Sequence, residues 1–122
     1  MDLLKLEAND TTVLEVMHPK RDVPVGIKIT LAGPSHEASR QAIRAMQDRQ
    51  AKRKIVSPEA DERDLVEVLA ARTLGWDGIE SNGKPLPFSI EAAKELYANP
   101  KLYWLRKQVF EAGVEDARFF DK

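Results

Sequence analysis

The sequence predicts a mainly α-helical α+β fold, with about four helices and a small β-hairpin near the N-terminus. Residues 25–31 alternate strictly between apolar and polar side chains, which is the period-two pattern of a half-buried strand. Further along, Ser57-Pro58-Glu59 and Asn99-Pro100 each place a capping residue before a proline, as is typical of a helix start. A chain of 122 residues with 43% hydrophobic content is long enough for one domain with a modest core.

The first 33 residues are predicted to hold the hairpin. Residues 11–17 contain β-branched side chains in rough alternation, and we expect Val13, Glu15 and Met17 on one side of that strand. In the second strand, the side chains expected on one face are Val25, Ile27, Ile29 and Leu31. An isolated hairpin is marginally stable in water, so it should pack on a helix or pair with another chain.

A basic helix is predicted from about His36 to Lys54, after the Gly33-Pro34 break and with Ser35 as its N-cap. Its apolar side chains are few and small, so the helix is expected to be weakly held by its own domain or to find its partner elsewhere. Its cations are candidates for partner binding: Arg40, Arg44, Arg49, Lys52 and Arg53.

An acidic helix follows, from the Ser57 cap to about Thr73, with Gly75 expected just beyond its end. Its predicted core face consists of Leu65, Val68, Leu69 and Leu74, with Val66 on the flank. The succession of a basic and an acidic segment indicates either pairing within the molecule or contact between copies. Contact between copies would give self-association.

Residues 76–89 read as a structured connector that Trp76, Ile79 and Phe88 fix to the core, with a turn at Asn82-Gly83. A short helix is predicted from Ile90 to about Ala98, with Ser89 as its cap and with Ile90, Ala93, Leu96 and Tyr97 facing inward. The last helix is expected from Lys101 to about Ala112, ended by Gly113.

The chain is therefore predicted to be one domain, residues 1–122, made of a β-hairpin region (1–33), a helical region (35–113) and a C-terminal tail (114–122). Phe119 and Phe120 lie in the tail outside any amphipathic pattern and are the best candidates for exposed apolar groups. They are expected either to fold back onto the last helix or to dock into another chain. Trp104 lies beside Tyr103, so one of the two should face outward. Trp104, Phe119 and Phe120 therefore join the candidate partner-binding residues.

No constellation of residues in the sequence points to catalysis. The absence of cysteine excludes disulfides and thiolate metal sites, and the two histidines, His18 and His36, have no carboxylate at metal-ligand spacing. Glycine-rich phosphate loops are absent. We expect a protein that is not an enzyme and that uses no cofactor and no metal. With no long apolar run and no secretory signal, it is expected to be soluble and cytoplasmic.

The basic helix raises the question of nucleic acid. Its arginines could line phosphates, but no aromatic residue is interleaved for base stacking, and the 19 basic residues of the chain are balanced by 20 acidic ones. An acidic protein surface is therefore the favoured partner for this helix.

Several stretches together resemble the tail assembly chaperones of long-tailed, siphophage-type bacteriophages. They are the His18-Pro19 turn before the strand at 26–31, the Ala32-Gly33-Pro34 break, the connector from Trp76 to Ser89, and residues 91–111. The resemblance covers nearly the whole chain. It rests on the general similarity of these stretches, since the family has no catalytic motif to compare.

The resemblance implies a non-enzymatic, mostly helical protein of the infected host's cytoplasm. Such chaperones bind the tape measure protein, help to recruit subunits of the major tail tube protein, and are generally absent from the finished virion. Many also exist in a C-terminally extended form made by translational frameshifting.

Two other classes of function remain open at this point. One is a permanent virion component, such as a head-tail connector or tail completion protein. The other is a small nucleic-acid-binding regulator that uses the basic helix.

Overall fold

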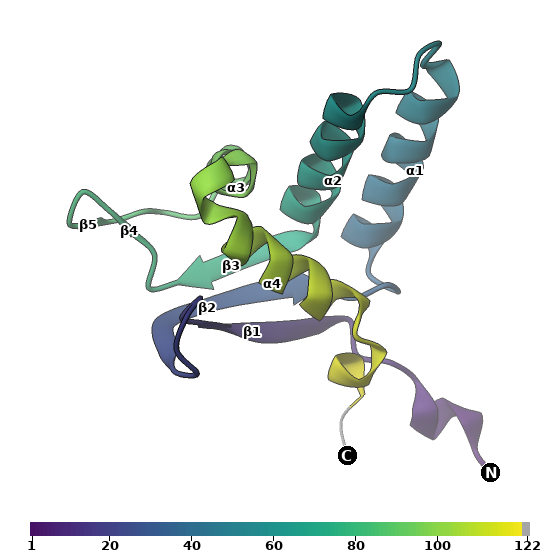
Figure 1. Cartoon of the computed structure of the whole chain (residues 1–122). Coiled ribbons are helices and arrows are strands. Elements are labelled where there is room, and N and C mark those ends of the chain that lie inside the picture. Colours follow the sequence, from purple (N-terminus) through teal and green to yellow (C-terminus); the bar gives the residue numbers. More distant parts are fainter. Residues whose placement is uncertain (121–122) are drawn as a thin grey trace.

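A three-stranded antiparallel sheet lies at the centre of the molecule, with strand order β1-β2-β3 (Figure 1). The computed structural model describes residues 1–120. The strands β1 (Thr11–Met17) and β2 (Pro24–Ala32) form the predicted hairpin. The third strand, β3 (Thr73–Asp77), was expected to be the end of a helix and the start of the connector. Gly75 is consequently paired with Thr30 in the sheet and does not terminate a helix.

Four α-helices accompany the sheet, which confirms the predicted α+β class: α1 (Glu37–Lys52), α2 (Pro58–Arg72), α3 (Ile90–Ala98) and α4 (Tyr103–Val114). Short 3-10 turns occur at Leu3–Leu6, Pro100–Leu102 and Asp116–Phe119. The Ser57 and Ser89 side chains cap α2 and α3 as predicted. The cap of α1 is His36 and not Ser35, because the Ser35 hydroxyl donates to Asp10 while His36 Nδ1 accepts the Ala38 N–H.

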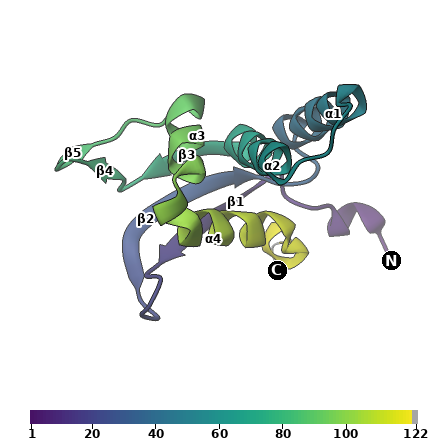
Figure 2. The same cartoon turned by 45° about the horizontal axis from the view of Figure 1, so that its top comes forward.

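Helices α2, α3 and α4 lie over one face of the sheet (Figure 2). On that face Leu14 is paired with Ile29, and both side chains are buried with Val16 and Leu31. Directly opposite residues of an antiparallel pair share a face, so a buried Ile29 requires a buried Leu14. Val13 and Glu15, which were predicted to share one side of this strand with Met17, are exposed, so the core side of β1 is the opposite one.

The hydrophobic core joins the sheet to the three covering helices. Tyr97 of α3 is fully buried, and its hydroxyl lies 2.8 Å from that of Thr73. Burial raises the pKa of Tyr97 to about 12, against the opposing effect of this hydrogen bond. Two predicted core positions, Leu74 and Ile90, are exposed, because Leu74 lies at an irregularity in β3 and Ile90 begins α3. The core is completed by Val66, Leu69, Ala70, Ala93, Leu105, Val109 and Ala112.

The connector has the predicted turn, although its first two residues belong to β3. Asn82 and Gly83 have φ angles of 54° and 77° and turn the chain between β4 (Glu80–Ser81) and β5 (Lys84–Pro85), as an Asn-Gly pair favours. Trp76 is half-buried and meets Phe88 edge-on, with ring centroids 5.0 Å apart. Its Nε1–H donates to the Leu86 carbonyl at 2.9 Å, so the side chain fixes the connector to the body.

Arg72, the last residue of α2, joins three other parts of the molecule. Its guanidinium donates to the Ala32 carbonyl at the end of β2, to Ser39 Oγ in α1 and to the Gly113 carbonyl in α4. Burial lowers the pKa of Arg72 below its ordinary value. Gly113 was predicted to end the last helix, but it is buried inside α4, and a Cβ there would lie 3.2 Å from Arg72 Nη1. The absence of a side chain thus leaves room for the guanidinium.

Contacts cross the boundaries between the predicted hairpin region, helical region and tail. β3 comes from within residues 35–113, and Phe119 from the tail packs against Gly33, where a Cβ would lie 2.8 Å from its ring. No helix within residues 1–120 is long and apolar enough to cross a membrane.

Candidate partner-binding surfaces

Helix α1 carries the basic residues that were predicted to bind a partner, and most of them already have acidic neighbours. Arg40 and Arg44 lie 3.4 and 3.7 Å from the carboxylate of Glu37 on the exposed side of the helix. Such exposed pairs contribute little to stability. Lys52 forms no ion pair within residues 1–120. The cation-rich helix is therefore partly neutralised by the chain itself.

Asp64 of α2 is the centre of an ion-pair cluster that joins α1 to α2. Its carboxylate is 3% exposed and lies 3.1 Å from Arg49 Nε and 2.8 Å from Arg53 Nη2. The hydrogen bond from Arg53 lowers the pKa of Asp64 below its ordinary value, against the burial that would raise it. Arg49 Nη2 is buried with no hydrogen-bond partner among the described residues. Arg49 and Arg53 thus act as structural links between α1 and α2.

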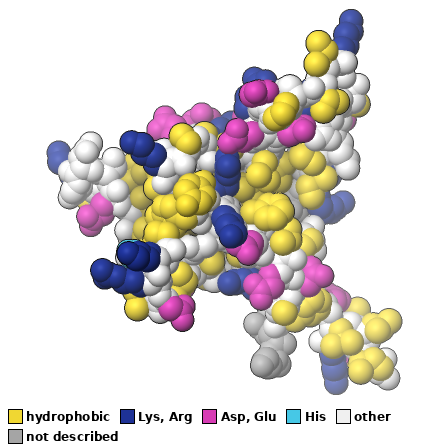
Figure 3. Space-filling view, viewed as in Figure 1, with side chains coloured by type: hydrophobic (Ala, Val, Ile, Leu, Met, Phe, Trp, Pro, Cys, Tyr) yellow, Lys and Arg dark blue, Asp and Glu magenta, His cyan; other side chains and the backbone are white. Residues whose placement is uncertain are grey.

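The tip of the α1–α2 hairpin projects from the body (Figure 1). Ile55 and Val56 lie in this tip and are 76% and 85% exposed. The neighbouring Lys52 and Lys54 are exposed as well. In the space-filling view, hydrophobic and basic side chains occur together at the end of this projection (Figure 3). A second projecting segment, the N-terminal turn Leu3–Leu6, exposes Leu3, Leu4 and Leu6.

Helix α4 presents its first aromatic residues next to the loop between β1 and β2. Tyr103 is 63% exposed, whereas Trp104 is half-buried and packs against the core, as the prediction that one of the two faces outward required. Both line a cavity of about 310 Å³ together with Pro19 and Lys107. The structure therefore brings the candidate residue Trp104 together with the His18-Pro19 turn, which lies far from it in sequence.

The two C-terminal phenylalanines have different surroundings. Phe120 is exposed, as predicted. Phe119 is only 1% exposed, so its prediction as an exposed group was wrong, and it follows the alternative in which it folds back onto its own chain. Its ring packs against Gly33, and its carbonyl accepts a hydrogen bond from the Asn9 N–H. It therefore folds back onto the end of the sheet, and Asp121 and Lys122 lie outside the described residues.

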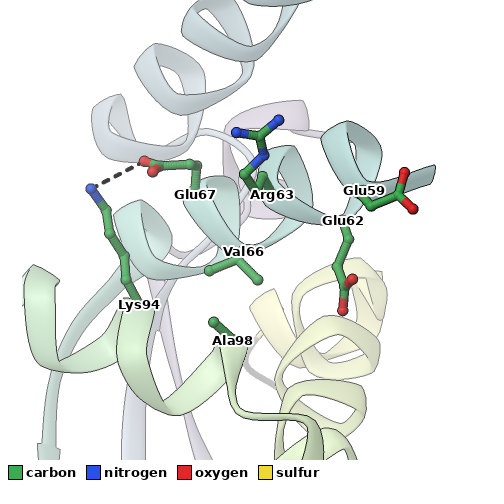
Figure 4. Close-up of a pocket in the computed structure, with 7 residues that line it drawn as sticks. All are labelled: Glu59, Glu62, Arg63, Val66, Glu67, Lys94 and Ala98. Atoms are coloured by element: carbon green, nitrogen blue, oxygen red, sulfur yellow. Dashed lines mark ion pairs between the residues drawn. The ribbon is translucent and has the colours of Figure 1, made fainter. Parts of the chain in front are cut away.

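A groove of about 440 Å³ runs between α2 and α3 (Figure 4). Val66 and Ala98 face each other across it, and an ion pair of 3.2 Å between Lys94 and Glu67 closes one side. The hydrogen bond with Glu67 raises the pKa of Lys94. Glu62 is likewise paired with Arg106 of α4, at 2.9 Å. Since these two glutamates have basic partners, the groove does not supply the pair of free carboxylates that acid–base catalysis would use.

Both histidines have structural tasks. His18 Nδ1 accepts the N–H groups of Lys20 and Arg21 at 3.0 and 3.1 Å, and His36 caps α1. Within residues 1–120, no group of three or more His, Cys, Asp or Glu side chains is arranged to hold a metal ion.

Sequence reasoning missed two of these features. The Asp64 cluster joins residues 11 and 15 positions apart, and the i,i+4 spacing of Arg49 and Arg53 was the available signal. The exposure of Leu3, Leu4 and Leu6 was not predicted, because only the position of the segment outside the core shows that they are uncovered.

Comparisons with protein-family models, with curated proteins and with solved structures find no match to this chain.

Proposed function

We propose that this protein is a tail assembly chaperone of a long-tailed bacteriophage, which binds the tape measure protein and helps to recruit tail tube subunits during tail morphogenesis. The resemblance of residues 18–34 and 76–111 to that family supports the proposal. One structural observation carries it: large aliphatic side chains are exposed on both segments that project from the body. They are Leu3, Leu4, Leu6, Ile55 and Val56.

Exposed aliphatic groups on projecting segments suit a protein that covers the apolar side of another chain. Contact with an amphipathic helix would remove Ile55 and Val56 from water, at about 25 cal/mol for each Å² of apolar surface buried. Lys52 and Lys54 keep the tip hydrated before binding and favour acidic neighbours on the partner. A chaperone for long, apolar helices of a tape measure protein needs this combination of surfaces.

The same features argue for a protein partner over nucleic acid. Arg40, Arg44, Arg49 and Arg53 all have carboxylates within 4 Å, so a phosphate backbone would compete with ion pairs that already exist. We place the activity in the host cytoplasm, before tail completion, with the protein absent from the mature virion.

Co-expression with the tape measure protein of the same phage tests the proposal. The soluble fraction of the tape measure protein should rise strongly when the chaperone is present. Ile55→Asp together with Val56→Asp should weaken that effect by about tenfold, since each removes an exposed anchor. Val114→Asp places the same charge at an exposed apolar position on α4 and serves as the control.

An unchanged solubility of the tape measure protein would contradict the proposal. Mass spectrometry of purified particles separates it from the main alternative, because a head-tail connector or tail completion protein would be found in the virion.

A further inference from the structure

We infer that the cavity between the β1–β2 loop and the beginning of α4 is a docking site for an acidic segment of a protein partner that carries an apolar anchor. The cavity has a volume of about 310 Å³, with Pro19 on one wall and Tyr103 and Trp104 on the other. It lies on a different surface from the α1–α2 tip. The inference therefore does not depend on the partner being a tape measure protein.

The walls of this cavity are fixed before any partner arrives. The Gln108 side chain accepts the Met17 N–H and donates to the Met17 carbonyl, both at 2.9 Å, so α4 is joined to the end of β1. The loop is folded on itself through the two N–H groups that His18 accepts. A pre-formed site loses less conformational entropy on binding than a flexible one.

Two aromatic side chains at the cavity have unused hydrogen-bond donors. Within residues 1–120, neither Tyr103 Oη nor Trp104 Nε1 has a hydrogen-bond partner, whereas the indole of Trp76 donates to Leu86. Aromatic residues with one apolar body and one free polar group are frequent anchors of protein interfaces. The ring of Trp104 would contact the apolar anchor, and the two donors would meet carbonyl or carboxylate oxygens of the partner.

The charges around the cavity select an acidic partner. Lys107 lines it, Lys20 and Arg21 follow Pro19 in the loop, and Lys101 precedes Tyr103. These four cations form no ion pair with the described residues. The carboxylate that lines the cavity is Glu111, and Asp22 follows Arg21 in the loop. Figure 3 shows hydrophobic side chains over the start of α4 with basic side chains beside the β1–β2 loop.

Glu111 distinguishes a peptide from a nucleic acid. It lies in the cavity wall, one helical turn beyond Lys107. A continuous phosphate backbone would be repelled at that position, whereas an acidic peptide can place a carboxylate at Lys107 and an apolar or neutral residue near Glu111.

The test is a titration of the full chain, labelled with ¹⁵N, with four probes of equal length. They are a twelve-residue peptide of glutamates around a central Leu-Leu pair, the same peptide with Lys for Glu, the acidic peptide with Ser for Leu, and a single-stranded oligonucleotide. The indole N–H signal of Trp104, assigned with Trp104→Phe, is followed. We expect it to shift with the acidic Leu-Leu peptide and with none of the other probes, while the Trp76 signal stays in place.

Two variants locate the site. Tyr103→Ala and Lys107→Glu should each weaken binding of the acidic peptide by about tenfold, as loss of a central interface residue does. Lys84→Glu makes the same charge change in the exposed β4–β5 hairpin and should leave binding unchanged. Equal binding of the acidic and basic peptides, binding of the oligonucleotide alone, or unweakened binding by Lys107→Glu would each overturn the inference.

Discussion

Helix α1, the outer helix of the α1–α2 hairpin, and the sheet-centred body are held in place by different forces. In the body, Val16, Ile29 and Tyr97 are fully buried, and strands and helices share one continuous apolar core. Helix α1 buries only Ser39 and Ala42, both in its first two turns, and its far half is tied to α2 through Asp64. Apolar burial therefore specifies the body, whereas paired charges position most of α1. Regions with few buried apolar contacts open at lower free energy than the core, so α1 is expected to be the more easily opened part of the molecule.

The largest effect should come from Ile29→Ala in the body. Removing this buried side chain leaves a cavity in the centre of the sheet and should lower the global free energy of unfolding by about 2–5 kcal/mol. Chemical denaturation monitored by circular dichroism measures the change. If the loss of stability were confined to α1, and the denaturation midpoint of the sheet were unchanged, apolar burial would not be what stabilises the body.

Replacing Asp64 by Asn should act on the hairpin alone. The amide cannot neutralise Arg49 and Arg53, so Arg49 would lose its counter-ion and Arg53 would keep only the exposed Asp61. Hydrogen exchange at the amides of the second half of α1 should become faster by about tenfold or more, while the strands keep their protection. Asp61→Asn, which alters the exposed partner of Arg53, is the matched control and should change exchange much less.

The two regions should lose stability at opposite ends of the pH range. The pKa of Asp64 is lower in the folded state, so its stabilising contribution is present above the unfolded value of about 3.9 and is lost as pH falls through the folded value. The pKa of Tyr97 is raised to about 12, so its contribution is present below the unfolded value of about 10 and is lost as pH rises towards 12. A pH titration by NMR should show α1 signals changing first in acid and core signals changing first in alkali.

The smallest effect on stability should come from the serine caps of α2 and α3. Ser57 Oγ accepts the Ala60 N–H, and Ser89 Oγ accepts the Ala92 N–H, at 3.1 and 3.0 Å. Ser57→Ala and Ser89→Ala should each cost about 1 kcal/mol. Ser57 lies beside the hairpin tip, so its replacement should also speed exchange in the neighbouring turn of α1. Thermal melts compare the two variants, and identical exchange in α1 would contradict the expected link between this cap and the hairpin.

Local patterns predicted the fold better than they predicted the surfaces. The alternation of β2 and the caps at Ser57 and Ser89 are short-range signals. The structure confirms both caps and the alternation from Ile27 to Leu31, whereas Val25 is exposed. β3 was missed because it follows α2 without a break, and only pairing with β2 makes residues 73–77 a strand. The burial of Phe119 depends in the same way on Gly33, 86 positions earlier in the chain.

The candidate surfaces were also only partly predictable from the sequence, because they depend on contacts between distant residues. The sequence indicated that Tyr103 or Trp104 faces outward, but the cavity they line requires the bond between Met17 and Gln108, 91 residues apart. The basic residues of α1 were identified correctly by type. Which of them have an ion-pair partner depends on the carboxylates that folding brings beside them. Asp64 alone pairs with two of them, Arg49 and Arg53.

The hydrogen bonds of Arg72 restrict how α1 can move. All acceptors of this guanidinium are backbone carbonyls or a serine hydroxyl, and none of these groups titrates between pH 2 and 12. Acid should therefore release the Asp64 end of α1 while the Ser39 end stays bound to β2, α2 and α4. Under those conditions α1 should rotate about its Ser39 end. The separation between α1 and α2 should then increase from Ser39 towards the tip of the hairpin.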